Sequence, residues 1–284
     1  MFRCLSPGAL GVNAGLEESL RLAKLGGFQG VEVGIQDIAK RVNESGAEAV
    51  KDLFASSGLR AGVWGLPVNW QTDDSAKFDA DLKALPGLAA AGAAIGCTRC
   101  ATYFPSWSDS RDYDVNLAWY VERFAPIARV LADHGCSLGL EFLGPKTLRA
   151  NHKYDFVHDI VGGLDLGERI GPNVGLLLDC WHWHTAGNTV DQIRATTADR
   201  VVHVHVNDAP AGIPNDEQID NVRCLPGETG VIDIAGFLGA LREIGYDGPV
   251  MPEPFSAKLK GVTPEEAIAM AGEGMAKIWS VAGL

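Results

Sequence analysis

Four short apolar segments of this chain each end in a side chain that can bind a metal ion or transfer a proton. These side chains are Glu141, Asp179, His205 and Glu253, at or near the last positions of residues 137–142, 174–179, 201–206 and 250–253. Carboxylates and imidazole are common ligands of divalent cations, and both act as general acids or bases. Four such residues on successive segments predict a metal or catalytic centre.

The composition of this set favours a divalent metal. Three carboxylates in one buried site repel one another and lose solvation, so either a cation offsets their charge or some of them take up protons. Three oxygen donors and one imidazole suit Mn²⁺ best, with Mg²⁺, Co²⁺ and Zn²⁺ as the other candidates. A closed structural zinc site would use more thiolate.

Polar and aromatic side chains near the same segment ends are candidates for binding a substrate. They are His182, Arg223, Trp64, Trp70, His184 and Lys146. The alternatives are an ion pair with an acid for each cation and plain packing for each tryptophan. We expect His203 to be a hydrogen-bonded core residue, and Asp208 either to orient a ligand or to cap its loop.

Strands that alternate with helices can bring these segment ends together. The predicted strands are residues 2–5, 30–35, 60–66, 99–103, 137–142, 174–179, 201–206 and 250–253. The predicted helices are residues 16–25, 38–56, 73–94, 115–134, 154–170, 190–196 and 234–244, and a last helix that Thr263 caps. Eight alternations predict a (β/α)8 TIM barrel, with residues 1–284 as a single domain. An open doubly wound sheet is the alternative, but no glycine-rich phosphate loop follows the first strand.

Alternation along each strand predicts which side chains face the barrel interior. Glu141 and Asp179 are expected to face inward, as are His203 and His205, while Val202, Val204 and Val206 are expected to face the helices. Residues 207–230 connect the seventh strand to its helix, and loops of this length are usually functional. In a barrel this connection lies on the face that carries the active site.

Charge and cysteine content limit the class of partner. The chain carries 24 basic and 36 acidic residues, a formal net charge of −12, which disfavours nucleic acid. We find no apolar stretch of bilayer length and no signal peptide, so we expect no membrane association. Six cysteines without a disulfide pattern indicate reduced thiols and a cytoplasmic protein. The expected partner is a small molecule, with a homo-oligomer left open.

Several motifs resemble the xylose-isomerase-like TIM-barrel superfamily of sugar phosphate isomerases and epimerases. They are residues 140–144, 174–184, 203–208, 225–230 and 252–253, so the resemblance is strongest from residue 138 onward. The resemblance implies a divalent-metal site formed by the four segment-end residues, with His182 near the substrate. It also implies an isomerase or epimerase of a keto-sugar or keto-inositol that works through an enediolate, with Glu141 and Glu253 as acid/base pair. A lyase or dehydratase using the same enediolate is the alternative, because the superfamily includes such enzymes.

Two positions depart from the ketose 3-epimerases of this superfamily. Those enzymes carry a second Glu where this chain has Thr147, and an Arg where it has Ala211. Arg223 instead resembles the arrangement of the inosose isomerases, which makes a ketohexose 3-epimerase the less expected activity. A DNA repair enzyme resembling endonuclease IV would need a three-zinc site and a basic face, and a metal-free binding protein is the remaining alternative.

Overall fold

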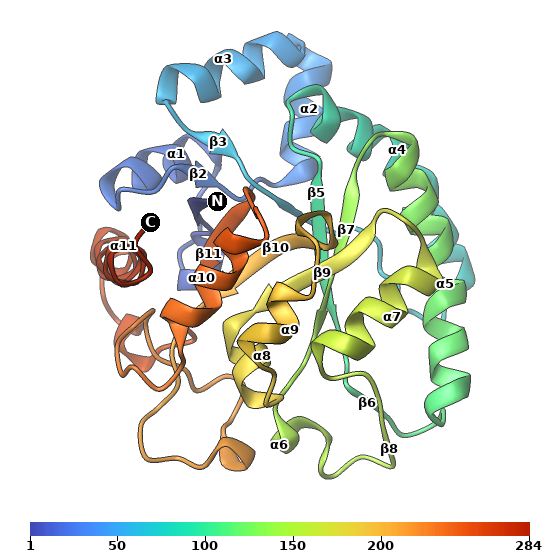
Figure 1. The fold of residues 1–284 in the computed structure, drawn as a ribbon. Helices are drawn as coiled ribbons and strands as arrows, with labels where there is room; N and C mark the ends of the chain where they lie inside the picture. Colours follow the sequence, from blue (N-terminus) through green and yellow to red (C-terminus); the bar gives the residue numbers. More distant parts are fainter.

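The apolar segments form parallel strands that close into a barrel in the computed structural model, which describes residues 1–284 (Figure 1). The strands are β1 (Phe2–Leu5), β2 (Gly30–Val31), β3 (Arg60–Ala61), β4 (Trp64–Gly65), β5 (Arg99–Phe104), β7 (Ser137–Phe142), β9 (Val174–Asp179), β10 (Val201–Val206) and β11 (Pro249–Pro252). They pair in the order β3-β2-β1-β11-β10-β9-β7-β5-β4. Only Gly62 and Val63 separate β3 from β4, so these two are halves of one barrel strand. The predicted TIM barrel is confirmed.

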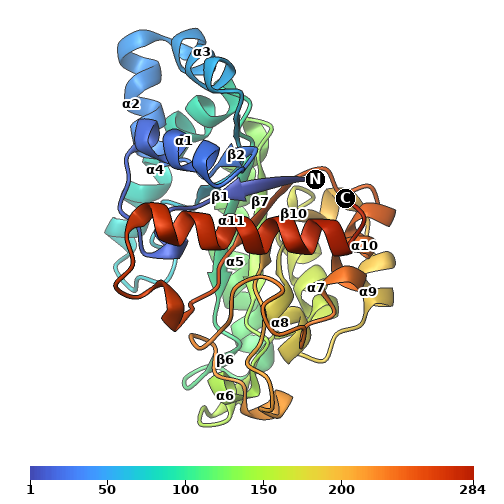
Figure 2. The same cartoon turned by 90° about the vertical axis from the view of Figure 1, so that its left-hand side faces the viewer.

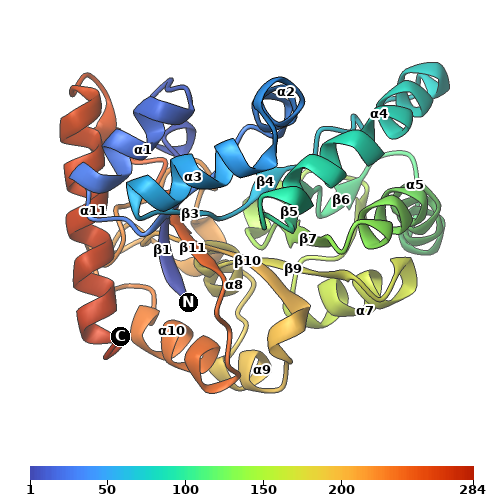
Figure 3. The ribbon, with the colours of Figure 1, turned by 90° about the horizontal axis from the view of Figure 1, so that it is seen from above.

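Helices surround the strands on all sides (Figure 3). The longer ones are α1 (Leu16–Leu25), α2 (Ile35–Ser45), α3 (Ala47–Ser57), α4 (Ser75–Ala94), α5 (Tyr113–Asp133), α7 (Ile160–Ile170), α10 (Ile234–Glu243) and α11 (Pro264–Val281). Short elements are α6 (Lys146–Arg149), α8 (Cys180–Thr185), α9 (Val190–Arg194), η1 (Gly8–Leu10), η2 (Ala198–Arg200), η3 (Asn215–Glu217), η4 (Ala257–Leu259), and the antiparallel pair β6 (Trp107–Ser108) and β8 (Tyr154–Asp155). The capping box predicted at Thr263 is present.

The structure differs from the predicted elements at four places. The strand expected over residues 30–35 ends at Val31, and helix α2 begins at Ile35. The helix expected over residues 38–56 is two helices, because Gly46 adopts a φ of 84° that a continuing helix cannot contain. The strand expected over residues 60–66 is interrupted at Gly62 and Val63. The helix expected from residue 154 begins at Ile160, because residues 154–155 pair with residues 107–108 instead.

The core has a layer outside the barrel and a filling inside it. One cluster of 62 buried residues, which includes Leu176 and Leu178, lies between the strands and the helices. Two smaller clusters fill the interior: Phe2 with Cys4 and Met251, and Val63 with Ala101 and Leu177. Side chains therefore alternate between the two layers along the strands, as the sequence predicts, with one exception in β10.

Strand β10 departs from simple alternation at its beginning. Its register against β9 shifts between Val201 and His203, so Val202 is an extra residue. Val201 belongs to the outer core. Val202 faces the interior, because a side chain added at the inward-facing Gly139 would meet it at 3.0 Å. The prediction that Val202 faces the helices is therefore wrong, because the extra residue changes the alternation. His203 and His205 pair with Leu177 and Asp179 and share their inward direction. Neither ring nitrogen of the buried His203 has a hydrogen-bond partner, so the expectation of a hydrogen-bonded core residue is wrong.

The strand ends that carry the candidate residues open toward one end of the barrel. In Figures 1 and 2 this end is the lower one, where α6, β6, β8 and the long connection after β10 project. We call this opening the barrel mouth. The long helix α11 lies beside α1 on the flank of the barrel (Figure 2). None of the helices combines the length and the apolarity that crossing a membrane would require.

Candidate metal and substrate site

The four segment-end residues converge at the barrel mouth. One potential ligand atom from each of Glu141, Asp179, His205 and Glu253 lies within 4.8 Å of the others. His205 Nδ1 is 3.3 Å from Glu141 Oε1 and 3.5 Å from Glu253 Oε2. We call these four residues the acidic cluster. They come from neighbouring strands β7, β9, β10 and β11, whose carboxyl ends meet here because the strands are parallel.

Burial and mutual charge set the ionisation of the acidic cluster. Burial raises the pKa of Glu141 more than His205 lowers it. Burial, the largest single effect, acts in the same sense on Asp179 and Glu253, but the neighbouring cations Arg223 and His205 together with hydrogen bonds outweigh it, so the pKa of each carboxyl is lowered. Burial opposes the charging of His205, yet the two glutamates raise its pKa well above the usual value.

The acidic cluster suits a divalent cation. Glu141 Oε1 and His205 Nδ1 are both buried without a hydrogen-bond partner although they face each other. Buried polar atoms without partners are rare and point to a missing ligand. A cation held by the four residues would satisfy both atoms and offset the carboxylate charge. The donor set of three carboxylates and one imidazole fits Mn²⁺, Mg²⁺, Co²⁺ or Zn²⁺.

Asp179 is held by its own helix and by a neighbouring strand. It caps α8, where its Oδ1 accepts hydrogen bonds from the backbone of Trp181 at 2.8 Å and from Asn207 Nδ2 at 3.0 Å. The helix α8 was not expected, because six residues are too few to show a helical period. The capping bonds orient the carboxylate, so that its second oxygen faces the mouth.

Arg223 reaches into the acidic cluster from the long connection after β10. Its Nη1 lies 2.6 Å from Asp179 Oδ2 and 3.2 Å from Glu253 Oε2, and its Nη2 lies 2.8 Å from Asp220 Oδ1. The guanidinium lies over the rings of Trp181 and Phe255, at 5.3 and 4.8 Å from their centroids. Phe255 has a φ of 36°, the one positive φ outside glycine, and such strain is common at functional sites.

His182 points one nitrogen toward the acidic cluster. Its Nδ1 accepts a hydrogen bond from the backbone N–H of Gly144 at 3.1 Å, so a neutral ring carries its proton on Nε2. That Nε2 is 4.0 Å from Glu141 Oε1 and 3.7 Å from Asp220 Oδ1, and it lies 3.4 Å from Arg223 Nη2, which cannot accept its proton. The ring can therefore donate a hydrogen bond to a molecule bound next to Glu141.

The structure does not bring every candidate residue to this site. Trp64 is fully buried and donates to the carbonyl of Cys97, and Trp70 packs at a tilted angle against Phe124 of α5, so both belong to the outer core. Lys146 is exposed and pairs with Asp216 at 2.6 Å. His184 is half-buried on α8 and makes no contact with the acidic cluster.

The long connection after β10 is ordered by one buried carboxylate. Asp208 accepts hydrogen bonds from the backbone N–H groups of Ala209, Thr229, Gly230 and Ile232, at 2.7 to 3.1 Å. Asp208 therefore shapes its loop and does not orient a ligand. The connection also contacts α6, because Thr147 Oγ1 donates to the carbonyl of Gln218.

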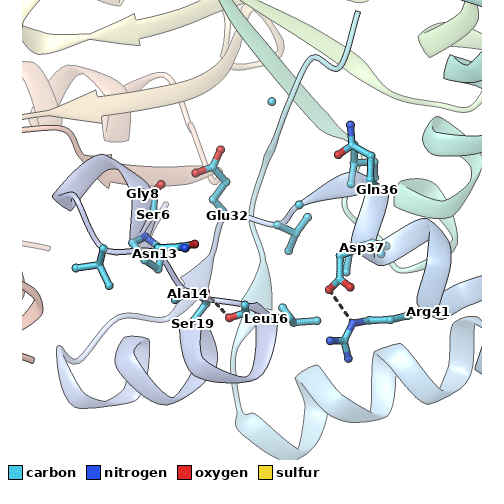
Figure 4. Close-up of a pocket in the computed structure, with 18 residues that line it drawn as sticks. Ser6, Gly8, Asn13, Ala14, Leu16, Ser19, Glu32, Gln36, Asp37 and Arg41 are labelled. Carbon is cyan, nitrogen blue, oxygen red and sulfur yellow. Dashed lines mark hydrogen bonds and ion pairs between the residues drawn. The ribbon is translucent and has the colours of Figure 1, made fainter. Parts of the chain in front are cut away.

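Sequence reasoning missed three residues at the mouth: Asp220, Phe255 and Glu32. The first two lie in connections without periodicity. The only signal in the sequence was that Asp220 lies close to Arg223 along the chain and Phe255 close to Glu253. Glu32 lines an open cavity of about 520 Å³ beside the β1–α1 connection and α2 (Figure 4). A second cavity of about 720 Å³ is lined by Arg223 and Phe255 on the other side of that connection.

Comparisons with known proteins agree with this architecture. Residues 20–278 match the family described as xylose isomerase-like TIM barrel. A structure of a xylose isomerase domain protein from Alicyclobacillus acidocaldarius is 30% identical, covers 100% of both chains and superimposes with a TM-score of 0.86.

Curated relatives include an isomerase and an epimerase. Inosose isomerase from Bacillus subtilis is 29% identical over 53% of this chain and 51% of its own length. L-ribulose 3-epimerase from Methylomonas sp. is 26% identical over 87% of this chain and 80% of its own length. The chain thus aligns with about half the length of the inosose isomerase.

Proposed function

Because this chain belongs to the xylose isomerase-like TIM barrel family, we propose that it is a divalent-metal-dependent isomerase or epimerase of a keto-sugar or keto-inositol. The observation that carries the proposal is the acidic cluster, in which Glu141 Oε1 and His205 Nδ1 are buried without partners. Mn²⁺ is the cation we propose. Six free cysteines support a reducing compartment such as the cytoplasm.

The chemistry follows from two carboxylates beside one cation site. A divalent cation held by the acidic cluster would polarise a ketone and stabilise the negative charge of an enediolate. Glu141 and Glu253 extend from β7 and from the end of β11, on either side of His205, so both can reach the substrate carbon next to the ketone. One carboxylate removes the proton from that carbon.

The position of proton return decides the product. Return to the adjacent carbon moves the carbonyl, and return to the opposite face of the same carbon inverts the centre. His182 Nε2–H is placed to hold a substrate oxygen during these steps, while Arg223 holds the carboxylates of Asp179, Glu253 and Asp220 in position. If a leaving group stood β to the carbonyl, the negative charge of the enediolate would expel it. This is the lyase or dehydratase alternative.

Solvent-isotope exchange tests this proposal. The protein is treated with EDTA, resupplied with Mn²⁺ or left without metal, and incubated in D₂O with 2-keto-myo-inositol, L-ribulose or D-fructose. We expect deuterium next to the carbonyl of at least one ketone, only with Mn²⁺, and at least about 100-fold slower exchange in Glu253→Gln. Glu273→Gln, an exposed change on α11, is the matched control and should leave the rate unchanged.

Product analysis then separates the alternatives. A moved carbonyl indicates an isomerase, an inverted centre an epimerase, and loss of water a dehydratase. Absence of exchange in every ketone with Mn²⁺ present, or exchange that neither EDTA nor Glu253→Gln reduces, would contradict the proposal.

A further inference from the structure

The acidic cluster occupies only half of the barrel mouth. The strands of the other half, β1, β2, β4 and β5, lead to Ser6, Glu32, Gly65 and Tyr103. Tyr103 pairs in register with Glu141, so this half ring lies at the height of the acidic cluster. Ser6, Glu32 and Gly65 line the 520 Å³ cavity. The two halves share one mouth, so a substrate held at the acidic cluster would have this half ring beside it.

Glu32 faces the barrel interior from the end of β2. Val31 belongs to the outer core, whereas a side chain on Gly30 would collide with the ring of Phe2 inside the barrel. Glu32, two residues after Gly30, therefore points inward. In Figure 4 it lies between the β1–α1 connection and helix α2.

The carboxylate of Glu32 has no partner within the protein. It is half-buried, and it makes neither a hydrogen bond nor an ion pair. The one cation that lines the cavity, Arg41, is held by Asp37 at 2.7 Å and by Glu17 at 2.6 Å. The cavity thus presents an acceptor with an uncompensated negative charge.

The distance between Glu32 and the acidic cluster suits a small polyol. The registers of β1 with β11 and with β2, continued by one to three residues, place Ser6 opposite both Glu253 and Glu32. Two strand spacings separate their backbones by roughly 10 Å, and their side chains converge from there. A six-carbon polyol bound at the acidic cluster can direct a remote hydroxyl toward Glu32.

We propose that Glu32 selects an uncharged polyhydroxylated substrate and rejects its phosphate ester, an inference that rests on the proposed function. A carboxylate accepts strong hydrogen bonds from hydroxyl groups. A phosphate group carries nearly two negative charges and would meet Glu32 without a free cation in this cavity. Arg223 cannot serve here, because Asp179, Glu253 and Asp220 already engage its guanidinium.

Binding measurements on the Mn²⁺-supplied protein test this inference without turnover. The probes are 2-keto-myo-inositol, D-fructose and D-fructose 6-phosphate, titrated by calorimetry. We expect at least one uncharged probe to bind at least 10-fold more tightly than the phosphate ester. Glu32→Gln should weaken the binding of the uncharged probe by about 10-fold, because a charge-assisted hydrogen bond is lost. It should also reduce the difference in affinity between the uncharged probe and the phosphate ester. For a ketone that is turned over, KM should rise with little change in kcat.

Two further variants separate charge from shape. Glu32→Asp keeps the charge, so it should still reject the phosphate ester while binding the polyol less tightly. Glu44→Gln, an exposed change on α2, should match the parent protein in every titration.

Three results would each overturn the inference. They are equal or tighter binding of the ester by the parent protein, unchanged affinities in Glu32→Gln, and no binding of any uncharged probe. Selective polyol binding without isotope exchange would instead refute the proposed reaction and leave the role of Glu32 standing.

Discussion

Replacement of Glu141 by glutamine should stabilise the metal-free protein while it removes the response to metal. Glu141 is 7% exposed, its Oε1 has no hydrogen-bond partner, and its ion pair with His205 at 3.3 Å does not offset burial, because the pKa of Glu141 is still raised. A buried charged group in this state costs about 1–3 kcal/mol or more. The amide keeps the shape and removes the charge, so we expect a gain of about 1–2 kcal/mol in the free energy of unfolding. For a chain of this length the gain corresponds to a rise of about 2–6 °C in Tm.

The same change should act in the opposite direction when metal is present. A cation at 100 times its Kd stabilises the parent protein by about 2.7 kcal/mol. If the loss of one ligand weakens binding by about 100-fold, the stabilisation of Glu141→Gln falls to about 0.4 kcal/mol. Differential scanning calorimetry with EDTA and with Mn²⁺ measures both quantities, and Glu273→Gln is again the control.

The pH dependence gives an independent check on the reasoning. Burial raises the pKa of Glu141, so its ionised form reduces stability at pH values above the folded-state pKa. This penalty disappears as the pH falls through that pKa, because the carboxyl then takes up a proton. The Tm advantage of the metal-free glutamine variant should therefore shrink from pH 7.5 to pH 5. A variant that is less stable than the parent without metal, or that keeps the full metal-induced rise in Tm, would refute the reasoning.

Two more substitutions test the contacts around the acidic cluster. Arg223→Met should lower the free energy of unfolding of the metal-free protein by about 3–5 kcal/mol in urea denaturation, because Asp179 loses its buried partner. Mn²⁺ should restore part of this loss. A loss below about 1 kcal/mol would contradict the assigned ion pair. Asp208→Ala removes the acceptor of four backbone N–H groups, so it should make residues 209–232 sensitive to limited proteolysis while the barrel stays folded. An unchanged cleavage pattern would show that contacts other than those of Asp208 order this loop.

The strands that carry the acidic cluster were predictable because their apolar runs are sharply bounded. Strands β7, β9 and β10 begin and end at the predicted residues. Parallel strands bring their carboxyl ends together, so the side chains at those ends had to meet. The pattern of residues was thus sufficient to predict that Glu141, Asp179 and His205 lie close together.

Other parts of the site depend on contacts that leave no periodic signal. Asp220 and Phe255 lie in irregular connections, and their relation to Arg223 exists only in three dimensions. Trp64 and Trp70 were placed at the mouth because they follow a strand, yet the helices α4 and α5 offer them apolar surface that the sequence does not reveal. The strands β6 and β8 are two residues long, too short for any alternation to show.

The extra residue in β10 has a consequence for how this chain can tolerate insertions and deletions. Val201 faces the helices, and after Val202 the alternation is reversed, so His203 and His205 face the interior. Deleting Val202 would restore a regular strand in which Val201 still faces the helices and His203 and His205 still face the interior, whereas an insertion between His203 and His205 would turn one of the two histidines outward. A relative without this residue would therefore keep both the apolar core contact of Val201 and the inward imidazole of His205. An alignment of this family is therefore reliable at the histidine only if it permits a one-residue gap at this position.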